Sequence, residues 1–133
     1  MNLHPRLSVF ALVLVCFSAA ACAPVAIRGT VIEGPISMIA VVDPDDPRLS
    51  QPGIAEATIT VQQTGVIGPI TERRSGEEGR FRLPLDGTGA LSRPMSMQIA
   101  AEGYLAAVEP TMPTPGNDQR VLVVLQPMRQ PSP

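Results

Sequence analysis

The segment "VVDPDDPRL" holds the densest group of side chains that could do chemistry in this 133-residue chain. Its three carboxylates, Asp43, Asp45 and Asp46, are oxygen ligands of the kind that Ca²⁺ prefers. An EF-hand loop would need Gly at its sixth position and Glu at its twelfth, and the chain has Arg48 and Ile54 there. Because Asp and Pro are also common turn residues, we interpret the segment as a turn and keep a calcium site as the alternative.

A second acidic group lies in "SGEEGRF", residues 75–81. Glu77 and Glu78 could in principle bind a metal ion, but two glycines bracket them, as at the tip of a hairpin. Gly79 can adopt the positive φ that a tight turn requires. Phe81, two residues later, then points to the same side as the apolar residues that follow it. We therefore predict that this segment is a solvated turn followed by a core residue.

The residue types needed for most catalytic sites are absent from the body of the chain. The single His is His4, at the very start, so neither a Ser-His-Asp nor a Cys-His arrangement can form further along. A zinc site of His and Cys ligands is excluded for the same reason. The chain has no Lys, which excludes Schiff-base chemistry. We predict that the protein is not an enzyme and has no cofactor.

The first residues, "MNLHPRLSVFALVLVCFSAAACAP", have the layout of a secretory signal. One positive charge at Arg6 precedes an apolar run from residue 7 to 17, and small residues follow. The run is shorter than the roughly 20 apolar residues of a membrane-spanning helix. We predict a helical signal peptide at residues 1–21.

The small residues before Cys22 resemble the lipobox of bacterial lipoproteins, although Ala19 stands where that family prefers Leu. The resemblance implies cleavage before Cys22 and acylation of its thiol and new amino group, which would anchor the chain firmly in a membrane. Residues 22–26 would then be a lipidated start and short tether. Ordinary secretory cleavage in the same Ala run, leaving a free thiol, remains the alternative. No acidic residue follows Cys22 directly, which points to the outer membrane, on its periplasmic or surface face.

The rest of the chain shows the two-residue periodicity of strands with one solvated face. The pattern is clearest in "EATITVQQ", "RFRLPL" and "MSMQIA", and looser in "VAIRGTVI". "RVLVVLQP" is apolar on both faces, which suits a central strand or one covered on both sides. "ISMIAVVD" (36–43) is a candidate extra strand, and Pro110, Pro113 and Pro115 predict a long loop before the last strand. The fold class is all-β, an antiparallel Ig-like sandwich of seven or eight strands.

Three stretches of the chain together resemble the carboxypeptidase regulatory-like domain, a transthyretin-like β-sandwich. They are "IAEATITV", "SGEEGRFRLPL" and "IAAEGYLAAV", and their matching motif residues include Gly79, Phe81, Gly103 and Tyr104. The chain departs from the pattern at Glu56, where the family has Gly, and at Gly76, where it has Asp. The resemblance covers residues 27–127 and implies a transthyretin-like fold. Residues 33–53 would form an unusually long first connection, and residues 128–133 a disordered tail.

These features predict a non-catalytic, membrane-anchored module with a structural or protein-interaction role in the cell envelope. Its partners would be the membrane, through the N-terminal lipid, and an envelope protein or glycan. The alternative is a ligand-binding module for Ca²⁺ or an envelope glycan. The net charge is −2 and no run of basic residues occurs, so nucleic-acid binding has no electrostatic support. The sequence does not indicate an oligomeric state.

Overall fold

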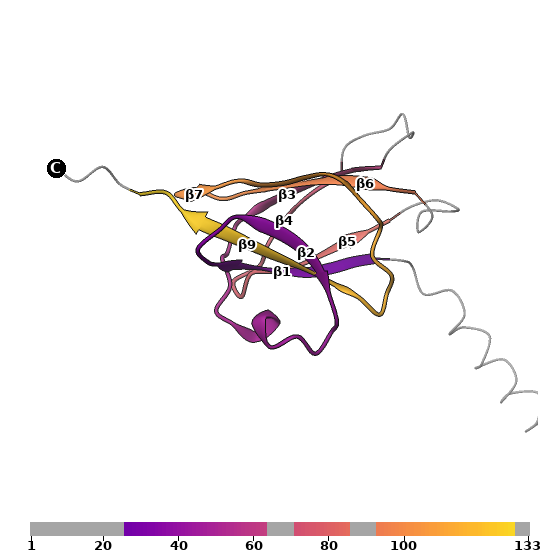
Figure 1. Ribbon diagram of the computed structural model, residues 1–133, viewed down its shortest axis with the longest axis horizontal. Helices are drawn as coiled ribbons and strands as arrows, with labels where there is room; N and C mark the ends of the chain where they lie inside the picture. Colours follow the sequence, from indigo (N-terminus) through magenta and orange to yellow (C-terminus); the bar gives the residue numbers. More distant parts are fainter. Residues whose placement is uncertain (1–25, 64–70, 86–92, 130–133) are drawn as a thin grey trace, which may run out of the picture.

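The computed structural model describes residues 26–63, 71–85 and 93–129, which form two β-sheets packed face to face (Figure 1). The predicted signal peptide, Cys22 and the last four residues lie outside this part of the chain. The strands are β1 (Ala26–Glu33), β2 (Met38–Val42), β3 (Thr58–Gln63), β4 (Thr71–Arg74), β5 (Arg80–Pro84), β6 (Met95–Ala100), β7 (Tyr104–Leu105), β8 (Ala107–Met112) and β9 (Arg120–Pro127). One 3-10 helix, η2 (Pro47–Ser50), follows β2. The prediction of an all-β sandwich is therefore confirmed at the level of fold class.

The first sheet has the strand order β2-β9-β1-β5, and β7 pairs with the end of β9. The central position of β9 explains its continuous apolar sequence, as predicted. One pairing differs from expectation, because β1 and β9 run parallel, with Gly29 opposite Val121. The other strand pairs of the described residues are antiparallel, so the expected purely antiparallel sandwich is wrong at this one pair.

The second sheet has the order β4-β3-β6-β8, and its central pair follows the predicted alternation. Ile59 of β3 lies opposite Ile99 of β6, and Val61 lies opposite Met97. All four side chains are buried, whereas the intervening Gln98 is exposed. The sheet therefore has one dry and one solvated face, as the two-residue period requires.

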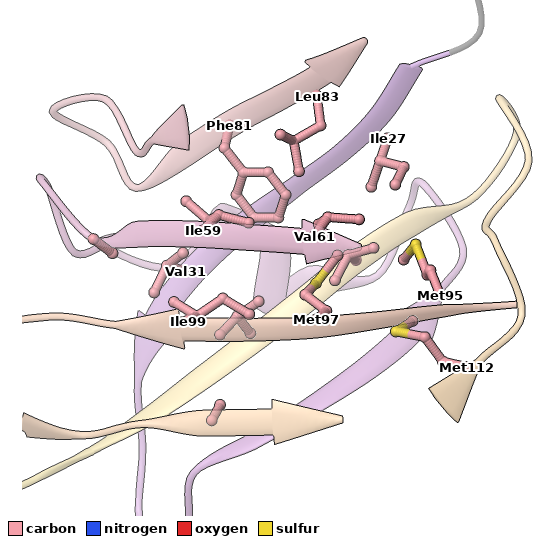
Figure 2. Close-up of a cluster of buried hydrophobic side chains, with 14 of the residues drawn as sticks. Ile27, Val31, Ile59, Val61, Phe81, Leu83, Met95, Met97, Ile99 and Met112 are labelled. Atoms are coloured by element: carbon pink, nitrogen blue, oxygen red, sulfur yellow. The ribbon is translucent and has the colours of Figure 1, made fainter. Parts of the chain in front are cut away.

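The core lies between the two sheets and is built almost entirely from aliphatic and Met side chains (Figure 2). β1 contributes Ile27 and Val31, and β5 contributes Phe81 and Leu83. Each fully buried aliphatic side chain stabilises the fold by about 1.5–3 kcal/mol. The chain has no disulfide within its described part that could substitute for this packing, since both cysteines lie before residue 26.

A smaller cluster covers the outer face of the first sheet. Ile32, Leu122 and Val124 are buried there, with Val42 and Leu49 packed against them. Leu49 belongs to η2, which Figure 1 shows on the side of β1 that faces away from β3 and β6. Residues 33–53 therefore add the predicted extra strand, β2, and also cover part of the outer face. This covering accounts for the apolar residues on both faces of β9.

The predicted loop before the last strand is present at residues 113–119, but Pro110 is part of strand β8, at the edge of the second sheet. Pro cannot donate a backbone hydrogen bond, so within sheets it is restricted to edges and bulges. Strand β8 is an edge strand, and it also has a bulge, because the register changes between the pairs Met97–Glu109 and Met95–Met112. With β8 and the two-residue β7, the described residues form nine strands, where seven or eight were expected. In this part of the chain, no helix has the length and apolar character needed to cross a membrane.

Candidate functional site

The hairpin that includes the "SGEEGRF" segment is closed by backbone hydrogen bonds rather than by its acidic side chains. The N–H of Gly76 donates to Arg80 O at 2.9 Å, and that of Gly79 donates to Gly76 O at 2.9 Å. Gly79 has a φ of 77°, the left-handed conformation that favours glycine. Glu78 is exposed and forms an ion pair with Arg80 at 3.4 Å. These contacts assign the hairpin a structural role.

Ser75, at the start of this segment, is a buried polar residue that ties two chain segments together. Its Oγ donates to Ile54 O at 2.7 Å and accepts a hydrogen bond from the N–H of Ala57 at 2.9 Å. The side chain is 2% exposed. Ser75 therefore satisfies buried backbone groups and has no free atom with which to act on a ligand.

Phe81 and Tyr104 both contact the core, but they differ in burial. Phe81 is 6% exposed and lies among aliphatic side chains in Figure 2, opposite Gly29 of β1. Tyr104 follows Gly103 (φ 84°), is half-buried, and donates from its hydroxyl to Glu33 Oε2 at 3.0 Å. This hydrogen bond raises the pKa of Tyr104, and partial desolvation acts in the same direction. The Phe81 ring is therefore not free to stack on a sugar.

The three Asp residues of the candidate calcium segment line one hollow beside η2, together with Gln119. Asp46 is already bound, because Arg48 donates to its two carboxylate oxygens from Nε (3.0 Å) and Nη2 (2.8 Å). These hydrogen bonds lower the pKa of Asp46. Asp46 also caps η2 by accepting from the Arg48 N–H at 3.0 Å. Within residues 26–63, 71–85 and 93–129, no three His, Cys, Asp or Glu residues are grouped as metal ligands.

A different site lies on the outer face of the first sheet. Its defining side chains are four arginines, from β1, β5 and β9, and we call it the arginine cleft: Arg28, Arg80, Arg82 and Arg120. Residues of the 33–53 segment form the opposite wall, including Pro44, Leu49 and Ser50. The cleft has a volume of about 510 Å³, and none of the described residues that line it is Asp or Glu.

The strand register explains how the arginines meet. Arg28 lies directly opposite Arg82 in the antiparallel pair of β1 and β5, and Thr30 lies opposite Arg80. Because these pairs are two residues apart, they share one face of the sheet. Arg120 begins β9, the neighbour of β1 on its other side, and its Nη1 donates to the carbonyls of Asn117 (3.0 Å) and Gln119 (2.9 Å).

The sequence contained only part of the signal for this cleft. Alternation in "RFRLPL" places Arg80 and Arg82 on the outward face, and "IRG" does the same for Arg28. These residues are far apart along the chain, so they form no basic run in the sequence. Two features that the sequence does not show create the cleft. They are the register of β1 against β5 and the return of residues 33–53 over the sheet.

No family model matches the chain, and neither a curated protein nor a solved structure matches it.

Proposed function

We propose that this protein is a non-catalytic β-sandwich module, lipid-anchored at Cys22 in the cell envelope, whose role is to bind another envelope protein. The signal-like N-terminus and the lipobox-like "AAAC" support the anchoring. The resemblance to the carboxypeptidase regulatory-like domain supports an interaction role rather than an active site. The two-sheet fold is compatible with that resemblance and is shared by many unrelated binding modules.

The observation that carries the protein-binding role is the set of exposed apolar residues at and just before the edge strand β2. This strand is the outermost of the first sheet. Ile36, just before it, is 66% exposed, and Met38 and Val41 are 40% and 38% exposed. An edge strand offers unpaired backbone groups, and apolar side chains beside them favour a protein partner that adds to the sheet or packs on its edge.

Metabolic labelling with a fatty acid tests the anchor. We expect the label on the wild-type protein and on Cys16→Ser, since Cys16 would leave with the signal peptide. We expect none on Cys22→Ser. Retention of the label by Cys22→Ser would contradict the assigned site.

Site-specific photo-crosslinking in cells tests the β2 edge. A crosslinking residue at Met38 should give one discrete protein adduct. The same residue at Gln98, which is exposed on the second sheet, should not. Identical adduct patterns from the two positions would count against a partner on β2.

A ligand-binding role is the second candidate function, and the arginine cleft favours it. Four guanidinium groups attract anions and repel cations, so the cleft fits an anionic group on a small molecule or an envelope glycan and does not fit Ca²⁺. This role would be independent of a protein partner on β2, because the cleft lies on the outer face of β1, β5 and β9.

A further inference from the structure

We propose that the arginine cleft is a binding site for a phosphate group, carried by a small molecule, a glycan or a lipid headgroup. This inference rests on the ligand-binding role given above as the second candidate function. It does not depend on a partner at β2.

The first argument is the unfavourable placement of the arginines in the absence of a ligand. Like charges directly opposite each other on neighbouring antiparallel strands are destabilising. Arg28 and Arg82 occupy such a pair, and Arg80 and Arg120 line the same cleft. In proteins, arrangements that work against folding in this way are expected at functional sites.

The second argument is that this charge is poorly compensated within the protein. Arg28 and Arg82 form no ion pair or side-chain hydrogen bond in the described part of the chain. Arg80 has one carboxylate partner, Glu78, and both of those side chains are more than 70% exposed. Within the described residues, Arg120 donates side-chain hydrogen bonds only to backbone carbonyls. The cleft therefore keeps most of its positive charge.

Elsewhere in the same protein, single carboxylates are matched one to one with arginines. Arg48 pairs with Asp46 at 2.8 Å, and Arg74 pairs with Glu56 at 3.2 Å. A carboxylate has one charge and two oxygens in a plane, so one guanidinium can satisfy it in a bidentate contact. Four guanidiniums from three strands require an anion with more charge and with oxygens in several directions. A phosphate group has both properties.

The remaining surface of the cleft fits a ligand larger than an isolated ion. Thr30, 6% exposed, lies between the arginines, and its hydroxyl has no hydrogen-bond partner in the described chain. In the described chain, every fully buried side-chain N or O atom has a hydrogen-bond partner. Because the Thr30 hydroxyl has none, it is not fully buried and must be accessible from the cleft. Leu49 and Pro44 supply an apolar wall. A volume of about 510 Å³ lies within the range of small-molecule sites.

Titration calorimetry on the full chain, purified as the cell processes it and held in chloride buffer, tests the proposal. The probes are inorganic phosphate, pyrophosphate and, as a carboxylate of similar charge, citrate. We expect pyrophosphate to bind and Arg82→Gln or Arg28→Gln to weaken its binding at least tenfold. Arg73→Gln is the matched control, because Arg73 is exposed on β4 in the second sheet, and it should change the affinity less than twofold.

A second measurement guards against loss of fold. Without ligand, Arg82→Gln should melt at or above the wild-type temperature, because it removes a like-charge pair. With pyrophosphate present, wild type should melt higher than Arg82→Gln. A variant that melts lower without ligand would contradict the charge argument directly.

Different failures have different meanings. If none of the three anions binds, the ligand-binding role itself is overturned. If citrate binds as tightly as pyrophosphate with the same dependence on Arg28 and Arg82, only the phosphate assignment is overturned.

Vesicles then separate the sources of the phosphate. Arg28 is six positions after Cys22, a span of at most about 20 Å, so an anchored cleft would lie near the headgroups. Binding of the Cys22→Ser chain to phosphatidylglycerol vesicles, lost in Arg82→Gln and absent with phosphatidylcholine, would support a lipid source. Pyrophosphate binding without binding to vesicles would support a soluble or glycan-borne phosphate.

Discussion

Gly53 and Gly79 pack backbone against backbone, and β1 runs beside both of them. A Cβ on Gly79 would lie 2.7 Å from Gly53 Cα and would also strike the carbonyl of Val31. Val31 uses both of its backbone groups here, donating to Gly79 O and accepting from the Ile54 N–H, each at 2.8 Å. The hairpin tip therefore forms part of a three-segment junction that has no room for a side chain.

Replacing Gly79 tests this junction. Gly79→Val should lower the free energy of unfolding by at least about 3 kcal/mol, from left-handed backbone strain together with the clash. Glu78→Gln changes an exposed neighbour and should alter stability by less than about 0.5 kcal/mol. Urea unfolding followed by circular dichroism measures both. Equal unfolding midpoints for the two variants would show that the junction is not needed.

Phe81 and its cross-strand partner Gly29 form a second close contact, which a double-mutant cycle can measure. A Cβ on Gly29 would strike the Phe81 ring and would lie 2.5 Å from Val121 O. Phe81→Ala should cost about 3–5 kcal/mol. Gly29→Ala should cost less in the Phe81→Ala background than in wild type, because the ring clash is gone. Additive losses would argue against direct packing of the ring on Gly29.

The sequence was sufficient to predict most of the strands, because their burial pattern is local. Alternation placed Ile59, Val61, Phe81 and Leu83 inward, and each is buried. Turn residues are a less certain guide, because Pro110 predicts a loop and lies in strand β8. A proline reveals that a backbone donor is absent, but it does not reveal whether the strand lies at an edge, where no donor is needed.

Other features depended on which strands are neighbours, and a single strand's pattern does not contain that information. The parallel pairing of β1 with β9 is one such feature. The arginine cleft is another, since Arg28 and Arg82 are 54 positions apart in the numbering and meet only through register. The acidic residues at 43–46 and 77–78 are candidates in the sequence because they are close together along the chain. Closeness along the chain is a weaker sign of a site than closeness in space.

Ser75 provides a third prediction about stability. Ser75→Ala leaves the Ala57 N–H and the Ile54 carbonyl without their hydroxyl partner. We expect a loss of about 2–4 kcal/mol, because unsatisfied buried polar groups cost about 1–3 kcal/mol each. Ser96→Ala is a suitable control, since the Ser96 hydroxyl makes one long contact of 3.4 Å to Gln62 O. A similar small loss for both variants would show that the Ser75 contacts are dispensable.

The hydrogen bond between Tyr104 and Glu33 predicts how the protein responds to alkaline pH. The Tyr104 hydroxyl donates to the Glu33 carboxylate, and this hydrogen bond raises the Tyr104 pKa above the ordinary value of 10.0. A group whose pKa is higher in the folded state stabilises the fold fully below the unfolded pKa, and that contribution is lost as pH rises through the folded pKa. The stabilisation should therefore be present at pH 9 and decline above pH 10.

This titration can be isolated because the chain has one Tyr and no Lys. The ultraviolet absorbance of tyrosinate should show a single midpoint above 10.0, and Glu33→Gln should move it down toward that value. Between pH 9 and pH 11, the free energy of unfolding should fall less steeply with pH in Tyr104→Phe than in wild type, because the substitution removes the titrating group. A wild-type midpoint at or below 10.0 would mean that the Glu33 contact does not form in solution.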